Sequence, residues 1–132
     1  MIRFHNFAIS EKGEVYGWGL NSFGQLGLGH DKNVDSPQLI PALTKLDIVE
    51  MAAGSFHSLA LSRDGSVYSF GQGRDGQLGH DAEEEKPVFE PTQIKEFGPH
   101  NPVAQISCGS QYSTAITKDG KVFLYFFFFF FF

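Results

Sequence analysis

Cysteine and positive charge are both scarce in this sequence. Cys108 is the only cysteine, so no disulfide can form within the chain, which fits a reducing compartment. Lysine and arginine together number 10 against 15 aspartates and glutamates, giving a net charge of −5. Because nucleic-acid binding needs clustered cations, this balance argues against general nucleic-acid binding. No secretory signal peptide is recognisable, so we expect an intracellular protein, nuclear or cytoplasmic, with no membrane partner.

The chain contains a repeated unit. The stretch Gly54–Gly79, GSFHSLALSRDGSVYSFGQGRDGQLG, holds two apolar segments around a turn, followed by a glycine-rich loop. An earlier copy covers Phe4–Gly27, and a broken later copy covers Gly109–Tyr125. Repetition at this period indicates a solenoid, a propeller or an array. The sequence therefore predicts a partial β-propeller over residues 1–125, with copies at 4–29, 54–79 and 109–125.

Each copy is predicted to form a β-hairpin. In the middle copy, Asp64-Gly65 is a strong signal for a two-residue type I′ turn, which needs positive φ at both central residues. With this turn Leu59 pairs with Phe70, so bulky side chains share one face of the hairpin and small ones the other. Such sheets can stack as propeller blades, bulky face against small face. The other predicted pairs are Ile9 with Tyr16, Phe7 with Trp18 and Ala8 with Gly17; Leu61 with Tyr68 and Ala60 with Ser69; Ile116 with Phe123, Thr114 with Tyr125 and Ala115 with Leu124.

Further strands and loops complete the predicted repeat. Apolar segments at Ile48–Ala53 and Val103–Cys108 precede two hairpins, and short strands at Gln38–Ile40 and Thr92–Ile94 bring each repeat to four strands. In each loop the leucine can fill the core and the glutamine can bond loop backbone. The positions that we expect to carry this architecture are Gly13, Trp18, Gly19, Gly24, Gln25, Leu26, Gly27, Gly54, Asp64, Gly65, Gly71, Gly76, Gln77, Leu78, Gly79, Gly109, Asp119 and Gly120.

Signals for catalysis, cofactors and metals are weak. Residues 71–76 match G-x-G-x-x-G, but a dinucleotide fingerprint must open a helix after a strand, and Gln77-Leu78-Gly79 follows instead. No G-x-x-x-x-G-K-[ST] loop occurs. His5 and His57 stand at equivalent repeat positions, which favours a structural role over a metal site. Cys108 aligns with Ala53, so we expect a small core residue there. We therefore expect no bond-making chemistry, no cofactor, no metal and no small-molecule substrate.

The repeat resembles a known family. The pattern G-x-x-H-S-x-A-L-x-x-D-G-x-V-Y-S-F-G followed by G-Q-L-G is similar to the repeat of the regulator of chromosome condensation family. Residues 18–21 and 24–27, WGLN and GQLG, match its other hallmark. The resemblance covers residues 4–125 and implies an all-β fragment, about two and a half blades, of a seven-bladed propeller with four-stranded antiparallel blades. Tyr112 departs from the pattern, which usually has histidine there.

Within that family the chain is most similar to the C-terminal repeats of the guanine-nucleotide exchange factors for the small GTPase Ran. The matching stretches are Phe7–Ser10 with Val15–Gly17, and Ala115–Gly120 with Val122-Phe123. The resemblance implies a small-GTPase partner held on one propeller face, where differential affinity for the nucleotide-free state drives exchange. It also implies chromatin contacts through other parts of the protein, and exchange activity only in the full-length protein.

The partner-contact candidates are His5, His57, Arg74 and Asp75. The alternative is that all four residues are structural or simply solvated. At the level of the whole protein, the alternative is a non-catalytic propeller module attached to a ubiquitin ligase, a trafficking protein or a scaffold. A third hypothesis, a nucleotide-dependent oxidoreductase, predicts nicotinamide binding.

The pattern stops at Tyr125, and residues 126–132 are seven phenylalanines. From Val122 the apolar run is too short for the roughly 20 residues of a helix that spans a bilayer. We interpret this low-complexity tail as unevolved sequence, from a truncated or misread coding region. Sequencing the transcript across the Tyr125 codon tests this hypothesis, since a clean spliced message encoding the run would contradict it.

Overall fold

The computed structural model describes residues 4–74, 76–79, 86–125 and 130–131. In these ranges the chain forms three antiparallel sheets and one short helix, α1 (Pro41–Thr44). We call the sheets the first, second and third blades. The first blade has the strand order β1 (His5–Ile9), β2 (Val15–Gly19), β3 (Val34–Leu39). The second blade has the order β4 (Ile48–Ala53), β5 (His57–Ser62), β6 (Val67–Gly71), β7 (Val88–Gln93). The third blade contains β8 (Val103–Cys108), β9 (Ser113–Thr117), β10 (Val122–Tyr125) and β11 (Phe130–Phe131), again in sequence order.

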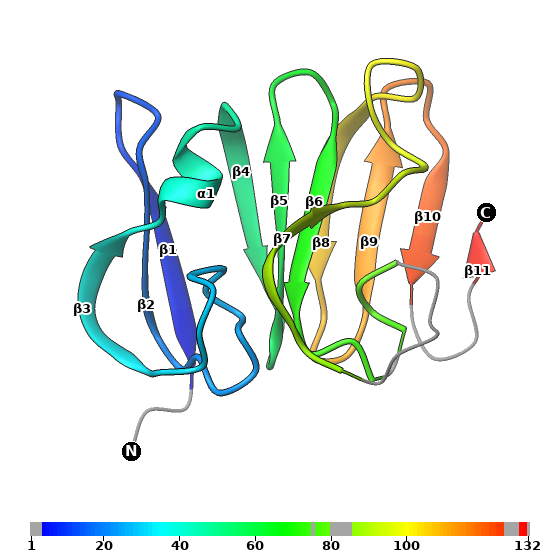
Figure 1. The fold of residues 1–132 in the computed structure, drawn as a ribbon. Coiled ribbons are helices and arrows are strands. Elements are labelled where there is room, and N and C mark those ends of the chain that lie inside the picture. The colour runs from blue at the N-terminus through cyan, green and yellow to red at the C-terminus, as the bar shows by residue number, and fades with distance from the viewer. Residues whose placement is uncertain (1–3, 75, 80–85, 126–129, 132) are drawn as a thin grey trace.

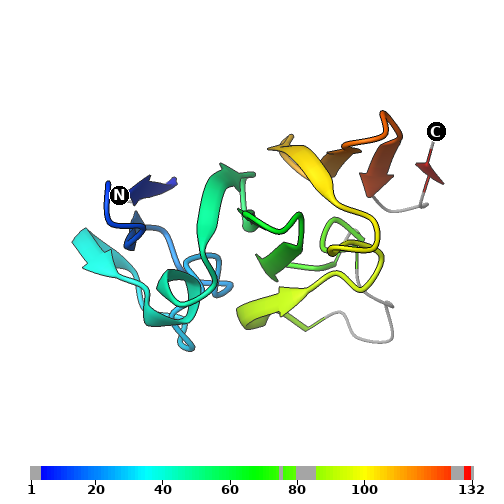
Figure 2. The same cartoon turned by 90° about the horizontal axis from the view of Figure 1, so that it is seen from above.

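The three blades stand side by side, in the order in which they occur in the sequence (Figure 1). Strand β4 contacts both β1 and β8, so these strands form one side of the array, while β3 and β7 lie on the far side (Figure 2). Neighbouring strands in each sheet follow one another in sequence. This radial meander is the arrangement of propeller blades, which confirms the predicted fold class.

The hairpin turns differ from the prediction. The Ser62 amide donates to the Ser66 carbonyl at 2.9 Å, and the Gly65 amide donates to the Ser62 carbonyl at 3.0 Å. Gly65 has a φ of 89°, whereas Asp47 is the only non-glycine with positive φ in the described ranges. Asp64 therefore does not supply the second positive φ of a type I′ turn. The loop has three residues, a type I turn closed by a glycine bulge.

The extra loop residue shifts every predicted cross-strand pair by one. Leu59 pairs with Ser69, and Phe70 pairs with Ser58. Because directly opposed residues share a face, each face combines the bulky side chains of one strand with the small ones of its neighbour. The predicted division into a bulky and a small face is therefore wrong. The observed pairs also include Phe7 with Gly17 and Ala8 with Tyr16 in the first blade, and Ile116 with Val122 and Ala115 with Phe123 in the third.

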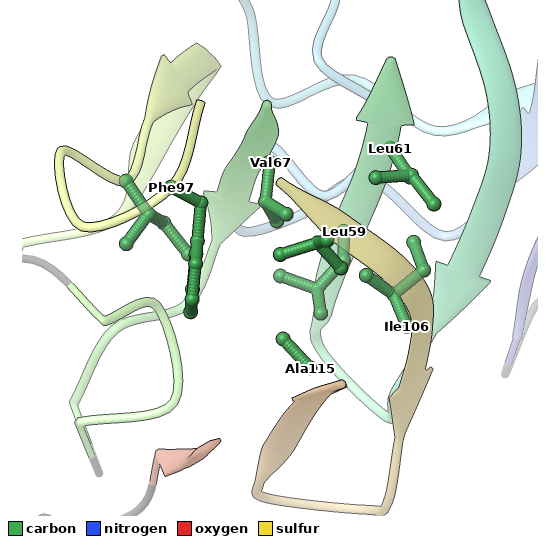
Figure 3. Close-up of a cluster of buried hydrophobic side chains, with 8 residues drawn as sticks. Leu59, Leu61, Val67, Phe97, Ile106 and Ala115 are labelled. Atoms are coloured by element: carbon green, nitrogen blue, oxygen red, sulfur yellow. The ribbon is translucent and has the colours of Figure 1, made fainter. Parts of the chain in front are cut away.

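This register gives each side of the second blade its own hydrophobic core. Leu59 and Leu61 of β5 point toward the third blade, where they pack with Ile106 and Ala115 (Figure 3). Phe70 of β6 belongs to the other core, toward the first blade. Fully burying one such side chain stabilises the fold by about 1.5–3 kcal/mol. The buried members of the two cores are Leu59, Leu61, Val67, Ile94, Phe97, Val103, Ile106 and Ala115, and Val15, Ile40, Leu43, Ile48, Ala60 and Phe70.

Several predicted elements appear with the same or similar bounds. Strands β4 and β8 match the predicted apolar segments residue for residue. The outer strands β3 and β7 exist but begin earlier than predicted. The first blade has three strands among the described residues. Of the phenylalanine tail, only β11 is described, and it pairs with β10 through Phe123 and Leu124; residues 126–129 and 132 lie outside the description.

Candidate functional site

One end of the blades brings together the residues just before β1, the β4–β5 turn and the β8–β9 turn. The β6–β7 loop lies at the same end (Figure 1). The Gly54 amide donates to the His57 carbonyl and the Gly109 amide to the Tyr112 carbonyl, both at 2.9 Å, so the two turns share one conformation. We call the surface residues of this end the rim. The rim consists of Phe4, Ser55, Phe56, Ser110, Gln111 and Tyr112.

The rim is tied together across the second and third blades. The Ser55 amide donates to the Ser110 carbonyl at 3.1 Å, and the two serine hydroxyls lie 2.8 Å apart. Phe56 makes an edge-to-face contact with Phe23 of the β2–β3 loop, with ring centroids 5.3 Å apart. These contacts fix the backbone beneath the exposed side chains. The rim is therefore a preorganised surface.

The two histidine candidates lie beneath the rim, in the interior. His57 is 0% exposed and His5 is 5% exposed. His5 Nε2 lies 2.8 Å from Ser58 Oγ, and Ser58 Oγ donates to the Gln25 carbonyl at 2.6 Å. Because Ser58 gives its own proton to Gln25, its oxygen accepts from His5, which assigns the proton of His5 to Nε2. His5 thus joins the first blade to the second.

His57 makes the corresponding link to the third blade. Its Nε2 lies 3.2 Å from the Tyr112 carbonyl, an acceptor, so Nε2 again carries the proton. The Nδ1 atoms of His5 and His57 are buried without a hydrogen-bond partner. Burial lowers the pKa of each histidine to about 4. Both rings are therefore neutral at physiological pH, and each acts as a donor between blades.

Glycine makes room for the His57 ring. A Cβ added at Gly54 would lie 2.2 Å from His57 Cε1, closer than packing allows. In the third blade, a Cβ at Gly109 would lie 2.1 Å from Tyr112 Cε1. The Tyr112 ring therefore takes the place of the histidine ring, but it is 46% exposed. Tyr112 belongs to the last copy in this chain, so no following copy covers its ring as the third blade covers His57.

The loop candidates fall differently. Arg74 is exposed in the β6–β7 loop, and Asp75 lies outside the described residues. No contact joins Arg74 to either histidine among the parts of the chain that are described. Gly71 is followed by irregular backbone with turns at residues 74 and 77–78, and the described residues 72–74 and 76–79 form no helix of the kind that a dinucleotide fingerprint requires. Partner contact by the four candidates stays a prediction.

The glutamines and leucines of the loops serve the interior. Leu26 and Leu78 are buried, and Gln25 Oε1 accepts a hydrogen bond from the Phe23 amide at 2.9 Å. Ser113 repeats the role of Ser58, because its Oγ donates to the Gln77 carbonyl at 2.6 Å. The backbone carbonyls of Gln25 and Gln77 thus each link a loop to the following blade.

Conventional catalytic chemistry finds little support at this end. Cys108 is partly buried against the core, and burial raises the pKa of its thiol to about 12, which disfavours a nucleophilic thiolate. Within the described ranges, no three His, Cys, Asp or Glu side chains are grouped to hold a metal ion. Nor does any described helix have the length and apolar character needed to cross a bilayer.

Sequence reasoning missed most of the rim. Phe4 is 73% exposed and occupies the repeat position of Phe56. The available signal was the aromatic residue just before each repeat histidine. Phe56 packs on Phe23 of the preceding blade's loop, whereas Phe4 belongs to the first copy in this chain and has no such loop beside it.

Comparison with known proteins decides the family. Models of the "Regulator of chromosome condensation (RCC1) repeat" match residues 12–61 and 64–116, and a second RCC1-repeat model matches residues 48–77. The chain belongs to the RCC1 repeat family. It is 37% identical over 123 residues to the human "Probable E3 ubiquitin-protein ligase HERC4", covering 92% of this chain and 11% of that protein. It is 35% identical over 121 residues to the zebrafish "Protein RCC2 homolog", covering 92% of this chain and 24% of that protein.

Two solved structures share the fold. The chain superimposes on Prp20p from Saccharomyces cerevisiae with a TM-score of 0.82 at 27% identity, covering 92% of this chain and 31% of Prp20p. Human WBSCR16 gives a TM-score of 0.80 at 28% identity, covering 94% of this chain and 31% of that one. The chain therefore spans about a third of the length of these two structures, and less of the length of the curated relatives it matches.

Proposed function

We propose that this chain is part of a protein-binding RCC1 propeller and that the rim is its contact surface. One observation carries the proposal: the rim presents uncharged polar and aromatic side chains, among them Phe56 and Gln111, on a frame in which the Ser55 amide donates to the Ser110 carbonyl. Aromatic residues on preorganised surfaces dominate the binding energy of many protein interfaces. The histidines below the rim support it as neutral donors between blades. Contact, and not bond chemistry, is what this arrangement can supply.

Within this class we propose nucleotide exchange on a small GTPase of the Ran type. The solved relative Prp20p is described by its binding to Gsp1p and histones, and its fold superimposes closely on this chain. An exchange factor needs only to bind the nucleotide-free GTPase more tightly than the nucleotide-bound form. A rigid rim suits this role, because little conformational entropy is lost when the partner binds. Additional blades of a longer protein would contribute to the same face.

A second candidate is a non-catalytic recognition module within a larger protein. The observation that favours it is the 37% identity to HERC4, of which the matched region is only 11%. In such a protein the rim would recruit a partner without changing nucleotide release. The two candidates share the surface and differ in the consequence of binding.

Nucleotide release tests both candidates. The protein that carries this chain is added to a Ran-type GTPase loaded with a fluorescent GDP analogue. Exchange predicts accelerated release, which Tyr112→Ala and Gln111→Ala, both at exposed positions of the β8–β9 turn, each slow by about tenfold or more. Lys12→Ala, an exposed site at the β1–β2 hairpin tip on the opposite end, is the matched control and leaves release unchanged. If nucleotide release is unchanged but capture of the partner depends on the rim, the recognition module is supported. If partner binding survives both rim substitutions, the rim is not the contact surface.

A further inference from the structure

A serine followed by proline lies on the outer edge of the first blade. Ser36-Pro37 is the only Ser-Pro or Thr-Pro pair in the sequence. It belongs to β3, the outermost strand of its sheet, where Asp35, Ser36 and Pro37 are all exposed. A residue before proline is biased to extended backbone. The pair is therefore presented in an extended conformation on a surface that a second protein can reach.

The backbone around Ser36 is released from the sheet. Strand β3 pairs with β2 through Val34 with Gly19 and Gln38 with Gly17, and the register shifts between these pairs. Residues 35–37 thus form a bulge opposite a single residue of β2. The Ser36 hydroxyl makes no hydrogen bond within the described part of the chain. By contrast, the hydroxyls of Ser58, Ser69 and Ser113 are buried and donate to backbone carbonyls.

We propose that Ser36 is a phosphorylation site for a proline-directed protein kinase. Kinases of this class bind the acceptor in an extended segment and accept proline directly after it, where no backbone N–H needs a partner. Ser36 Oγ attacks the γ-phosphorus of Mg·ATP, the bond to the bridging oxygen breaks, and ADP leaves with that electron pair. The hydroxyl proton passes to the catalytic base of the kinase.

The second blade shows that this position accepts negative charge. Residues 88–93 of β7 have the same bulged pairing as residues 34–39, so Glu90-Pro91 takes the place of Ser36-Pro37. Glu90 is exposed, and its Oε1 would lie 3.4 Å from a Cβ added at Gly29 in the β2–β3 loop. A carboxylate thus permanently occupies the blade edge there. Phosphorylation would place about −2 of charge at the same point of the first blade.

In vitro phosphorylation tests the site. The protein that carries this chain, in its folded state, is incubated with Mg·ATP and a cyclin-dependent kinase, and phosphate on residues of this chain is mapped by mass spectrometry. The expected result is phosphate at Ser36, lost in Ser36→Ala and strongly reduced in Pro37→Ala. Ser22→Ala, an exposed serine without a following proline, is the matched control and leaves incorporation unchanged.

A second variant tests whether a negative charge at residue 36 disturbs the fold. Ser36→Glu should leave the melting temperature unchanged, because Glu90 already occupies the equivalent bulge. Phosphate that persists in Ser36→Ala would overturn the proposal. Phosphorylation of Ser36 only after the chain is unfolded would also overturn it, and so would a lack of phosphate at Ser36 in both the folded and the unfolded chain.

Discussion

The Nε2 atom of His5 lies 2.8 Å from the Oγ atom of Ser58, across the junction between the first and second blades. Ser58 passes the interaction on to the carbonyl of Gln25 in the first blade. One serine hydroxyl thus accepts from one residue and donates to another of the neighbouring blade, with both groups buried. The repeat places Ser113 at the equivalent point of the next junction. At the second junction His57 bonds the Tyr112 carbonyl and not the Ser113 hydroxyl, so the two junctions share the serine link to the loop but differ at the histidine.

Removal of the Ser58 hydroxyl should loosen the first junction. Ser58→Ala leaves the His5 N–H and the Gln25 carbonyl buried without their partner, which costs about 1–3 kcal/mol of the free energy of unfolding. Urea denaturation measures this loss. Ser22→Ala, at an exposed loop position, is the control. Equal unfolding midpoints for the two variants would contradict the proposed role of Ser58.

Acid should destabilise the fold through the two buried histidines. Burial lowers the pKa of His5 and of His57 to about 4 in the folded chain, against about 6.5 when unfolded. Above pH 6.5 both histidines are neutral in the folded and in the unfolded chain, so their protonation does not lower the free energy of unfolding. As pH falls toward 4 the unfolded chain binds protons first, so stability falls by up to about 1.4 kcal/mol per pH unit for each histidine.

Denaturation midpoints between pH 7 and pH 4 measure this slope. His5→Asn and His57→Asn should each flatten it, while His100→Asn, at an exposed position, should not. A slope that does not change in either buried variant would show that other groups cause the acid sensitivity.

Gly54 should tolerate no side chain. Gly54→Ala places a methyl group against the His57 ring and 2.7 Å from the Gly109 carbonyl oxygen, so overpacking should cost about 1–3 kcal/mol. A double-mutant cycle with His57→Ala separates the two clashes. Part of the cost should disappear in the double variant, because the ring is gone while the carbonyl remains. Strictly additive effects would show that the ring is not the obstacle.

The register predicts unequal roles for two repeat-equivalent side chains. Leu61 is 3% exposed between the second and third blades, whereas Ile9 in the first blade is 37% exposed. Leu61→Ala should therefore cost about 2–5 kcal/mol, and Ile9→Ala clearly less. Thermal and urea unfolding of both variants compare them directly. A larger loss for Ile9→Ala would contradict the placement of the core.

The strands could be predicted from the sequence because apolar patterning and turn glycines are local. The strand at Ile48–Ala53, for example, can be predicted without knowing which strands lie beside it. The turn type was not accessible, since Asp-Gly fits both a type I′ turn and a type I turn with a glycine bulge. The two differ in the backbone angles of Asp64, and that one-residue difference determines which side chains share a face.

The candidate site was harder to predict because its geometry depends on contacts between repeats. His5 and His57 were predicted as partner-contact candidates, with a structural role as the alternative, and each is buried by a turn or strand of the following copy. The exposure of Tyr112 has the same cause, because this chain holds no following copy that could bury its ring. The sequence of one repeat carries no information about what the next repeat covers.

The central claim is that the rim binds a protein partner, and hydrogen exchange tests it most directly. Backbone protection is measured on the protein that carries this chain, alone and with a nucleotide-free Ran-type GTPase. We expect slower exchange at residues 55–56 and 110–112, with residues 10–14, 62–66 and 117–121 at the opposite hairpin tips unchanged. Protection confined to those tips, or no change at the rim in a complex that has formed, would contradict the account.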